Sequence, residues 1–111
     1  MARPADVKPY ASLRRSPDIG RVRRVGTRRR AGGITVFAAP GGSGPARVAF
    51  VAGRTVGNAV RRNRAKRRLR EAVRKVPLPS GRDYVVIASA IVVGAPFETL
   101  VAWARAAMSE E

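Results

Sequence analysis

The stretch VGNAVRRNRAKRRLREAVRKV, residues 56–76, is the most informative part of the sequence. If residues 58–76 form a helix, one stripe of it is apolar and comprises Ala65, Leu69, Ala72, Val73 and Val76. Arg and Lys dominate the rest of this segment, in which Glu71 is the sole acidic residue. Like charges one turn apart destabilise a helix unless something neutralises them. The pattern therefore predicts a helix that packs its apolar stripe on a sheet and presents its cations to an anionic partner.

The whole chain has the same charge bias. Lys and Arg number 23 and Asp and Glu number 7, which gives a formal net charge of +16 on 111 residues. Such an excess repels itself in the compact state, and nucleic acid relieves it while releasing condensed counterions. An anionic membrane surface is the alternative partner, and a solvated helix face is the alternative interpretation of the charge run. Arg outnumbers Lys, which favours RNA or DNA, although high-GC codon usage also raises Arg.

Strands are predicted on both sides of the basic helix. Residues 34–38 (ITVFA) and 47–52 (RVAFVA) predict two antiparallel strands joined by a flexible hairpin loop at residues 40–45. Alternation places Ile34 and Val36 on one face of the sheet, and Thr35 and Phe37 on the other. We expect a short third strand at residues 53–56. The continuous apolar run at residues 84–88 (YVVIA) predicts a central strand.

Two more helices complete the expected domain. Ser16-Pro17 is typical of a helix start, and Gly26 of a helix end. Pro96 opens a last helix, whose apolar positions should cover the sheet and comprise Phe97, Leu100, Val101, Ala104 and Met108, with Trp103 at the edge. Residues 1–12 lack periodicity and predict a flexible basic tail before a single domain over residues 13–111. The predicted fold is an α+β sandwich in the order α-β-β-β-α-β-α, with helices on a small mixed sheet.

The composition also excludes several kinds of site. The chain has neither Cys nor His, and therefore lacks disulfides, thiolate metal sites and the commonest general base. Its seven acidic residues are scattered over different predicted elements, which disfavours a protein site for paired catalytic Mg²⁺. No apolar run approaches the roughly 20 residues of a membrane span, and the N-terminus lacks the apolar core of a signal peptide. We expect a cytoplasmic protein without a membrane partner.

The basic segment resembles a known family. Residues 56–60 (VGNAV), followed by Arg62-Asn63-Arg64, Lys66-Arg67 and Arg70-Glu71, resemble the Arg-Asn-Arg signature of the bacterial ribonuclease P protein. The resemblance extends to Leu13-Arg14, Phe37, residues 83–88 and Pro96-Phe97, and covers roughly residues 13–107. It implies that residues 13–111 form the ribonuclease P protein domain. It also implies that the basic helix joins two parallel strands by a left-handed crossover, against the general right-handed preference.

The resemblance further implies a function. Proteins of this family bind the catalytic RNA subunit of ribonuclease P and the 5′ leader of precursor tRNA, and assist endonucleolytic removal of the leader. The RNA subunit and the substrate hold the catalytic Mg²⁺, so the resemblance implies no catalytic residue, no dedicated metal site and no required protein partner in this chain. The residues carried over to the RNA-subunit surface are Arg61, Arg62, Asn63, Arg64, Lys66, Arg67, Arg68, Arg70 and Arg74. Those carried over to the leader cleft are Ile19, Arg23, Phe37 and Arg54.

The chain departs from the family pattern in the cleft. The family usually has aromatic residues where this chain has Ile19 and Arg23, so charge should contribute more to leader binding here. A basic pair of the family is reduced to Gly53-Arg54-Thr55, and Ser89 replaces a basic residue. Two alternatives remain from the sequence alone. A structural RNA-binding protein of ribosomal type explains the charge but not the spacing of the signature, and an autonomous nuclease lacks catalytic residues.

Overall fold

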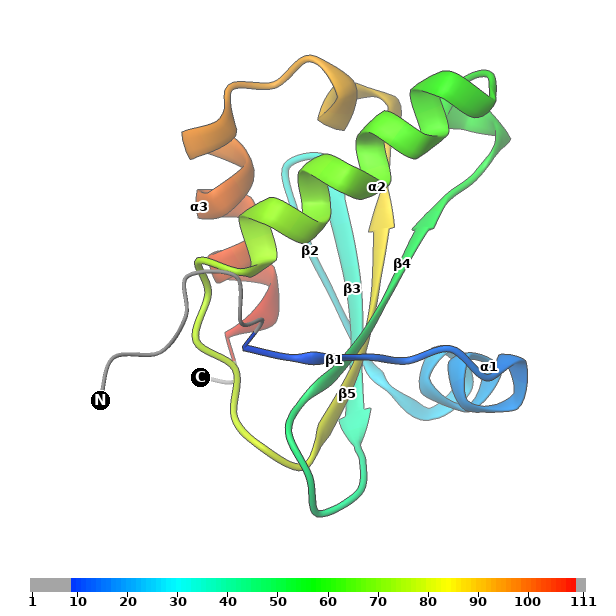
Figure 1. Cartoon of the computed structure of the whole chain (residues 1–111), viewed down its shortest axis with the longest axis vertical. Coiled ribbons are helices and arrows are strands. Elements are labelled where there is room, and N and C mark those ends of the chain that lie inside the picture. The colour runs from blue at the N-terminus through cyan, green and yellow to red at the C-terminus, as the bar shows by residue number, and fades with distance from the viewer. Residues whose placement is uncertain (1–8, 110–111) are drawn as a thin grey trace.

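In a computed structural model, which describes residues 9–109, the chain forms one mixed sheet with three α-helices (Figure 1). The elements in chain order are β1 Ala11–Ser12, α1 Ser16–Val25, β2 Thr27–Ala31, β3 Ile34–Pro40, β4 Arg47–Ala52, the 3₁₀-helix η1 Arg54–Val56, α2 Ala59–Val73, β5 Arg82–Ala88, the 3₁₀-helix η2 Ala90–Val93, and α3 Phe97–Met108. The strand order is β1-β4-β5-β3-β2. The predicted α+β class and mixed sheet are confirmed.

Strand β5 occupies the centre of the sheet, as its apolar run predicts. It pairs with β4 in parallel and with β3 antiparallel. The predicted hairpin between residues 34–38 and 47–52 is therefore wrong, because β5 lies between the two strands. Tyr84, Val85 and Val86 are fully buried, so consecutive residues of β5 are covered on both faces. A strand with this pattern needs neighbours on each edge and a layer on each face, which the central position supplies.

The two faces of the sheet carry separate cores. Ile34, Val36 and Val86 pack with α2 and α3 in the larger core. Val85 and Ala49 pack with Val22 of α1 in the smaller core, against which Phe37 is half-buried. The predicted alternation is thereby confirmed, since Ile34 and Val36 belong to the larger core and Phe37 packs against the smaller one.

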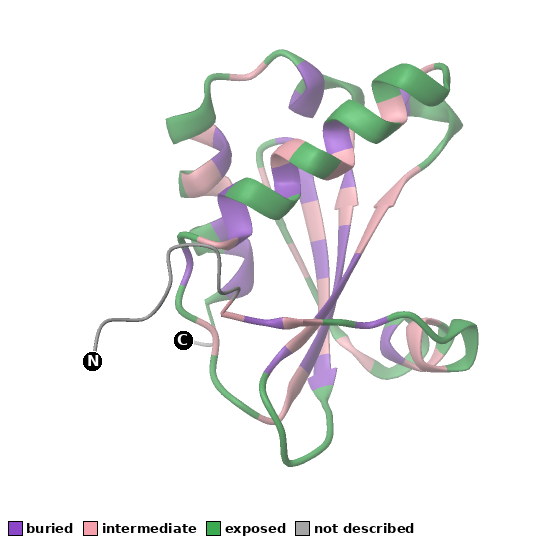
Figure 2. Cartoon of the chain, in the orientation of Figure 1, coloured by how far each residue is buried: buried purple, intermediate pink, exposed green. Residues whose placement is uncertain are grey.

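Helix α2 lies across the larger core and joins the parallel strands β4 and β5. Its predicted apolar stripe is confirmed, because Ala65, Leu69, Ala72 and Val73 are all fully buried. Figure 2 shows buried residues on the side of α2 that faces the sheet and exposed residues on its outer side. The side chain of Asn58 accepts a hydrogen bond from the backbone N–H of Arg61 at 3.0 Å and so caps the helix N-terminus. The left-handed sense of the crossover stays a prediction.

The sequence analysis did not predict the two short strands β1 and β2. Strand β2 (TRRRA) lacks apolar alternation because it is an edge strand, on which charged side chains also block pairing with other chains. The turn that follows it requires Gly32, whose φ is 53° and whose missing Cβ leaves room for the indole of Trp103. The expected third strand at residues 53–56 is wrong, since Arg54–Val56 forms η1.

The chain is ordered earlier than the predicted domain boundary. Tyr10 is buried, and Ala11–Ser12 pairs in parallel with Arg47 and Val48 of β4. The predicted flexible tail is therefore wrong for residues 10–12, because a strand of two residues is too short to show periodicity. Residues 1–8 of that tail lie outside the described part of the chain. At the other end, the prediction that Phe97 covers the sheet is also wrong, because its side chain is exposed.

The Asp83 carboxylate connects α1, β4 and β5 through hydrogen bonds. Asp83 of β5 is 1% exposed and is the sole buried charged residue within residues 9–109. Arg21 of α1 donates to its Oδ2 at 2.6 Å, and Arg47 of β4 donates to its two oxygens at 2.9 and 2.8 Å. The hydrogen bond to Asp83 raises the pKa of Arg47 above its ordinary value. Asp83 thus offsets cationic repulsion where helix and sheet meet.

We expect Asp83→Ala to lower the free energy of unfolding by about 3 kcal/mol, measured by urea denaturation. Breaking a buried ion pair costs roughly 3–5 kcal/mol, and the lower value applies because the two arginine side chains are 33% and 37% exposed. Glu98→Ala is the control, since it removes one negative charge from an exposed position. Equal losses in the two variants would show that net charge, rather than this contact, is responsible.

Candidate nucleic-acid interface

The outward face of α2 carries a row of exposed basic side chains. Arg61, Arg64, Arg67 and Arg70 follow one another at intervals of three residues, and all four are exposed, as is Asn63. Arg62, Lys66 and Arg74 are half-buried beside them. Glu71 pairs with Arg74 at 3.3 Å, so the single acid of the helix offsets a cation at its C-terminal end. The remaining cations present positive charge suited to a phosphate backbone.

Arg68 differs from the other basic residues of α2. Its Nη1 donates to the carbonyl oxygens of Val92 and Val93 at 2.8 and 2.9 Å, and its Nη2 donates to that of Ala95. These bonds attach η2 to α2 and satisfy carbonyl groups near the turn into α3. The guanidinium donors of Arg68 are thus used inside the protein. The charge pattern of the sequence does not distinguish this residue from Arg67, which has no hydrogen-bond or ion-pair partner among the described residues.

The α1 side of the sheet brings together three of the four predicted cleft residues. Ile19 and Phe37 are half-buried against the smaller core. The guanidinium of Arg23 lies over the Phe37 ring, 5.8 Å from its centroid. Arg54 is exposed on η1 and belongs to neither hydrophobic core. The structure therefore groups an aromatic ring, a cation and an aliphatic side chain on one face, with Arg54 apart from them.

Strand β2 adds two arginines that the sequence analysis missed. Arg28 pairs with Phe37 in the β2–β3 register, and Arg30 pairs with Thr35. Paired residues project to the same face of a sheet, so both arginines flank the Phe37 ring on the α1 side, and both are exposed. Arg29 belongs to the other face and donates to the carbonyl oxygen of Ser109. The signal in the sequence was the Gly32-Gly33 turn before the strand at Ile34, which indicates a preceding partner strand.

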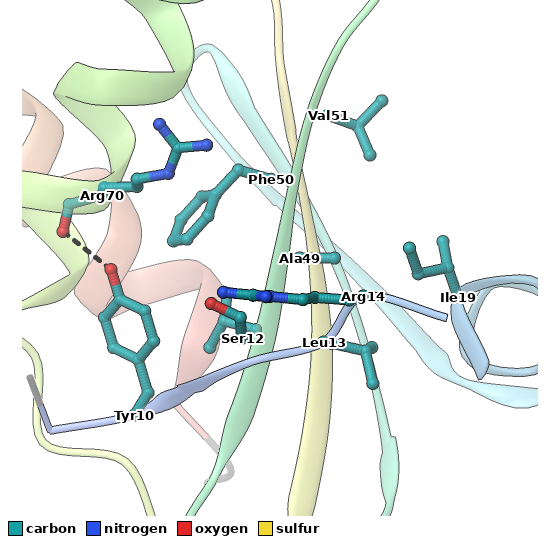
Figure 3. A pocket seen from close by; sticks show the side chains of 10 residues that line it. Tyr10, Ser12, Leu13, Arg14, Ile19, Ala49, Phe50, Val51 and Arg70 are labelled. Carbon is teal, nitrogen blue, oxygen red and sulfur yellow. Dashed lines mark hydrogen bonds between the residues drawn. The ribbon is translucent and has the colours of Figure 1, made fainter. Parts of the chain in front are cut away.

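A pocket of about 480 Å³ lies where β1 ends beside β4 (Figure 3). Its lining comprises Tyr10, Ser12, Leu13, Arg14, Ile19, Val48, Ala49, Phe50, Val51 and Arg70. The Tyr10 hydroxyl donates to the carbonyl oxygen of Arg70 at 3.2 Å. Burial raises the pKa of Tyr10, while the positive charges of Arg70 and Arg74 act in the opposite direction. The pocket includes one residue of each predicted RNA surface, Arg70 and Ile19.

The described residues also bear on metal sites and membrane spans. Within residues 9–109, no group of three or more acidic, His or Cys side chains is placed to hold a metal ion. No helix in that part of the chain is long and apolar enough to cross a membrane. What the arrangement offers chemically is phosphate binding by guanidinium groups and stacking on aromatic rings.

Comparisons with known proteins agree with this geometry. The model of the Ribonuclease P family matches residues 7–110. The ribonuclease P protein component of Chloroflexus aggregans is 43% identical over 93 residues, which cover 81% of this chain and 69% of that protein. The solved ribonuclease P protein of Thermotoga maritima has a TM-score of 0.77 at 26% identity, covering 87% of this chain and 94% of that one. The chain therefore belongs to the ribonuclease P protein family, as the protein component of this ribonucleoprotein endonuclease and the partner of the ribonuclease P RNA.

Proposed function

We propose that the protein holds the ribonuclease P RNA on the outward face of α2 and the 5′ leader of precursor tRNA on the α1 side of the sheet. The observation that carries this proposal is the separation of the two surfaces. Helix α2 covers the face to which Ile34 and Val36 belong, whereas Phe37 belongs to the opposite face. Two RNA segments can therefore bind at the same time without competing for one surface.

The composition of each surface suits a different RNA form. The α2 face presents a row of exposed guanidinium groups, which favours contacts to a phosphate backbone held in a fixed shape. The α1 face presents the Phe37 ring with Arg23 over it and Arg28 beside it. An aromatic ring among cations is the arrangement that binds unpaired bases and their phosphates. A single-stranded leader fits the second surface, and the folded RNA subunit fits the first.

We infer that the protein assists cleavage by binding and by charge neutralisation. The chain has no His or Cys, and its described acidic residues form no metal-binding group. These features support placing the catalytic Mg²⁺ with the RNA subunit and the substrate. The direct test is precursor-tRNA cleavage at low Mg²⁺ with protein alone, RNA subunit alone, and both. We expect efficient cleavage with both; cleavage by the protein alone would contradict the proposal.

Arg67→Ala should weaken binding to the ribonuclease P RNA without changing the melting temperature. Loss of one duplex phosphate contact should also reduce the log–log salt slope by up to roughly 0.9. The matched control is Arg68→Ala, which removes the same charge from the next residue of the helix. Because Arg68 donates to three carbonyl groups, that variant should melt earlier. RNA affinity across a salt series and a melting curve for each variant make the comparison. Similar behaviour of the two variants would refute the assignment of Arg67 to the RNA surface.

Phe37→Ala should leave assembly with the RNA subunit intact and weaken holoenzyme affinity for precursors that carry a 5′ leader. Stacking on an aromatic ring contributes about 1–3 kcal/mol per base, so leader-dependent affinity should fall roughly 5- to 100-fold. The measurement compares precursors with a long leader and with a leader of one nucleotide.

The control for this variant is Phe97→Ala, which removes an exposed phenylalanine at the start of α3. It should bind both substrates as the wild type does. Because Phe37 is half-buried against the smaller core, a melting curve must accompany the binding data. Equal loss on both substrates in a well-folded Phe37→Ala protein would rule out the leader assignment.

A further inference from the structure

Strand β1 covers only part of the outer edge of β4, the edge that faces away from β5. Strand β1 pairs only with Arg47 and Val48, and the chain then turns away after Leu13 towards α1 (Figures 1 and 3). The remainder of the edge, residues 49–52, has β5 on one side and, among residues 9–109, no strand on the other. The pocket of about 480 Å³ lies at the point where β1 leaves this edge.

The backbone of Phe50 supplies a donor and an acceptor to the pocket. Along the β1 side of β4, the N–H of Ala11 donates to the carbonyl oxygen of Ala46 at 2.8 Å, and the N–H of Leu13 donates to that of Val48 at 3.0 Å. Peptide groups of a strand face the same edge at every second residue. The next groups on that edge are the N–H and C=O of Phe50, and the register of β1 with β4 ends before them, at Val48.

The side chains of the pocket combine flat apolar surface with positive charge. The Phe50 ring is half-buried, with the Tyr10 ring 5.8 Å away at an angle of 59°. The Arg70 guanidinium lies 5.8 Å from the centre of the Phe50 ring. Figure 3 shows Arg14 extending across the pocket from the α1 side towards Ser12. Among the described residues, the lining contains two arginines and no acidic residue.

We propose that this pocket binds one unpaired nucleotide of a single-stranded RNA segment. The base lies against the Phe50 ring and the Arg70 guanidinium, its edge meets the N–H and C=O of Phe50, and Arg14 binds the adjoining phosphate. The pocket volume is within the range of small-ligand sites. A β-strand from another protein could pair with the same backbone groups, but the two arginines and the net charge of +16 favour a polyanion.

This site goes beyond the two surfaces of the proposed function, because it lies at the edge of the sheet between them. Its lining includes Ile19 from the α1 side and Arg70 from α2. An RNA strand that continues from one surface to the other passes the pocket, where a single base can leave its stack and enter. The pocket therefore adds recognition of an unpaired base to contacts that are otherwise made mainly with phosphates.

The test uses the whole chain and two RNA trinucleotides, one with a central base and one with a central abasic position. Binding is measured by fluorescence anisotropy at one fixed salt concentration. For the wild type we expect the abasic trinucleotide to bind roughly 5- to 100-fold more weakly, the effect of losing one stacked base. Phe50→Leu keeps most of the apolar volume and should abolish this difference, whereas Phe97→Leu should retain it.

A second pair of variants tests the phosphate contact. Arg14→Ala should weaken both trinucleotides by the same factor, whereas Arg15→Ala, with the same charge change outside the pocket lining, should weaken them less. A melting curve for each variant shows that it is folded.

The proposal is overturned if the abasic difference persists in folded Phe50→Leu protein, or if the wild type shows no difference. A difference that disappears in Phe37→Ala instead would place the base in the leader cleft and equally overturn it. This test contains neither tRNA nor ribonuclease P RNA, so its outcome does not bear on the proposed function. Conversely, failure of the leader experiments would not decide whether this pocket binds a base.

Discussion

The burial of β5 on both faces is the constraint on which the rest of the structure depends. Tyr84 and Val86 face one core and Val85 faces the other. Each face therefore needs its own cover, which α2 and α3 supply on one side and α1 on the other. This arrangement separates the basic face of α2 from the Phe37 surface, so the apolar pattern of one strand places the two proposed RNA surfaces on opposite sides of the sheet.

The excess positive charge destabilises the folded protein through repulsion, and particular contacts offset this repulsion locally. Asp83 accepts hydrogen bonds from Arg21 and Arg47 at the junction of α1, β4 and β5, while Arg68 donates to carbonyl groups near η2. Both interactions use arginine as a structural residue, where its several donors satisfy several acceptors at once. On the outward face of α2, Arg67 has no hydrogen-bond or ion-pair partner within residues 9–109, and an RNA phosphate can supply one.

The sequence predicted best where one physical signal dominates. The apolar stripe of α2, the central position of β5 and the alternation at Ile34 and Phe37 all follow from burial, and burial has a clear period. Strand β2 was missed because its TRRRA sequence reflects an exposed edge, and β1 because two residues form no pattern. The false hairpin arose because sequence order does not show that β5 inserts between β3 and β4. The pocket depends on where β1 leaves β4, which no local pattern records.

Among the arginines, identical residues have different roles because of geometry alone. Arg67 and Arg68 are neighbours on one helix, yet one faces outward and the other bonds to the turn before α3. Arg28 and Arg29 are neighbours on β2, yet one lies beside Phe37 and the other bonds to the chain after α3. In each case a rotation of 100° or 180° per residue selects the surface that the side chain reaches. Charge composition therefore favours an RNA partner, whereas the helical and strand periods determine which cations face outward and which hold the fold.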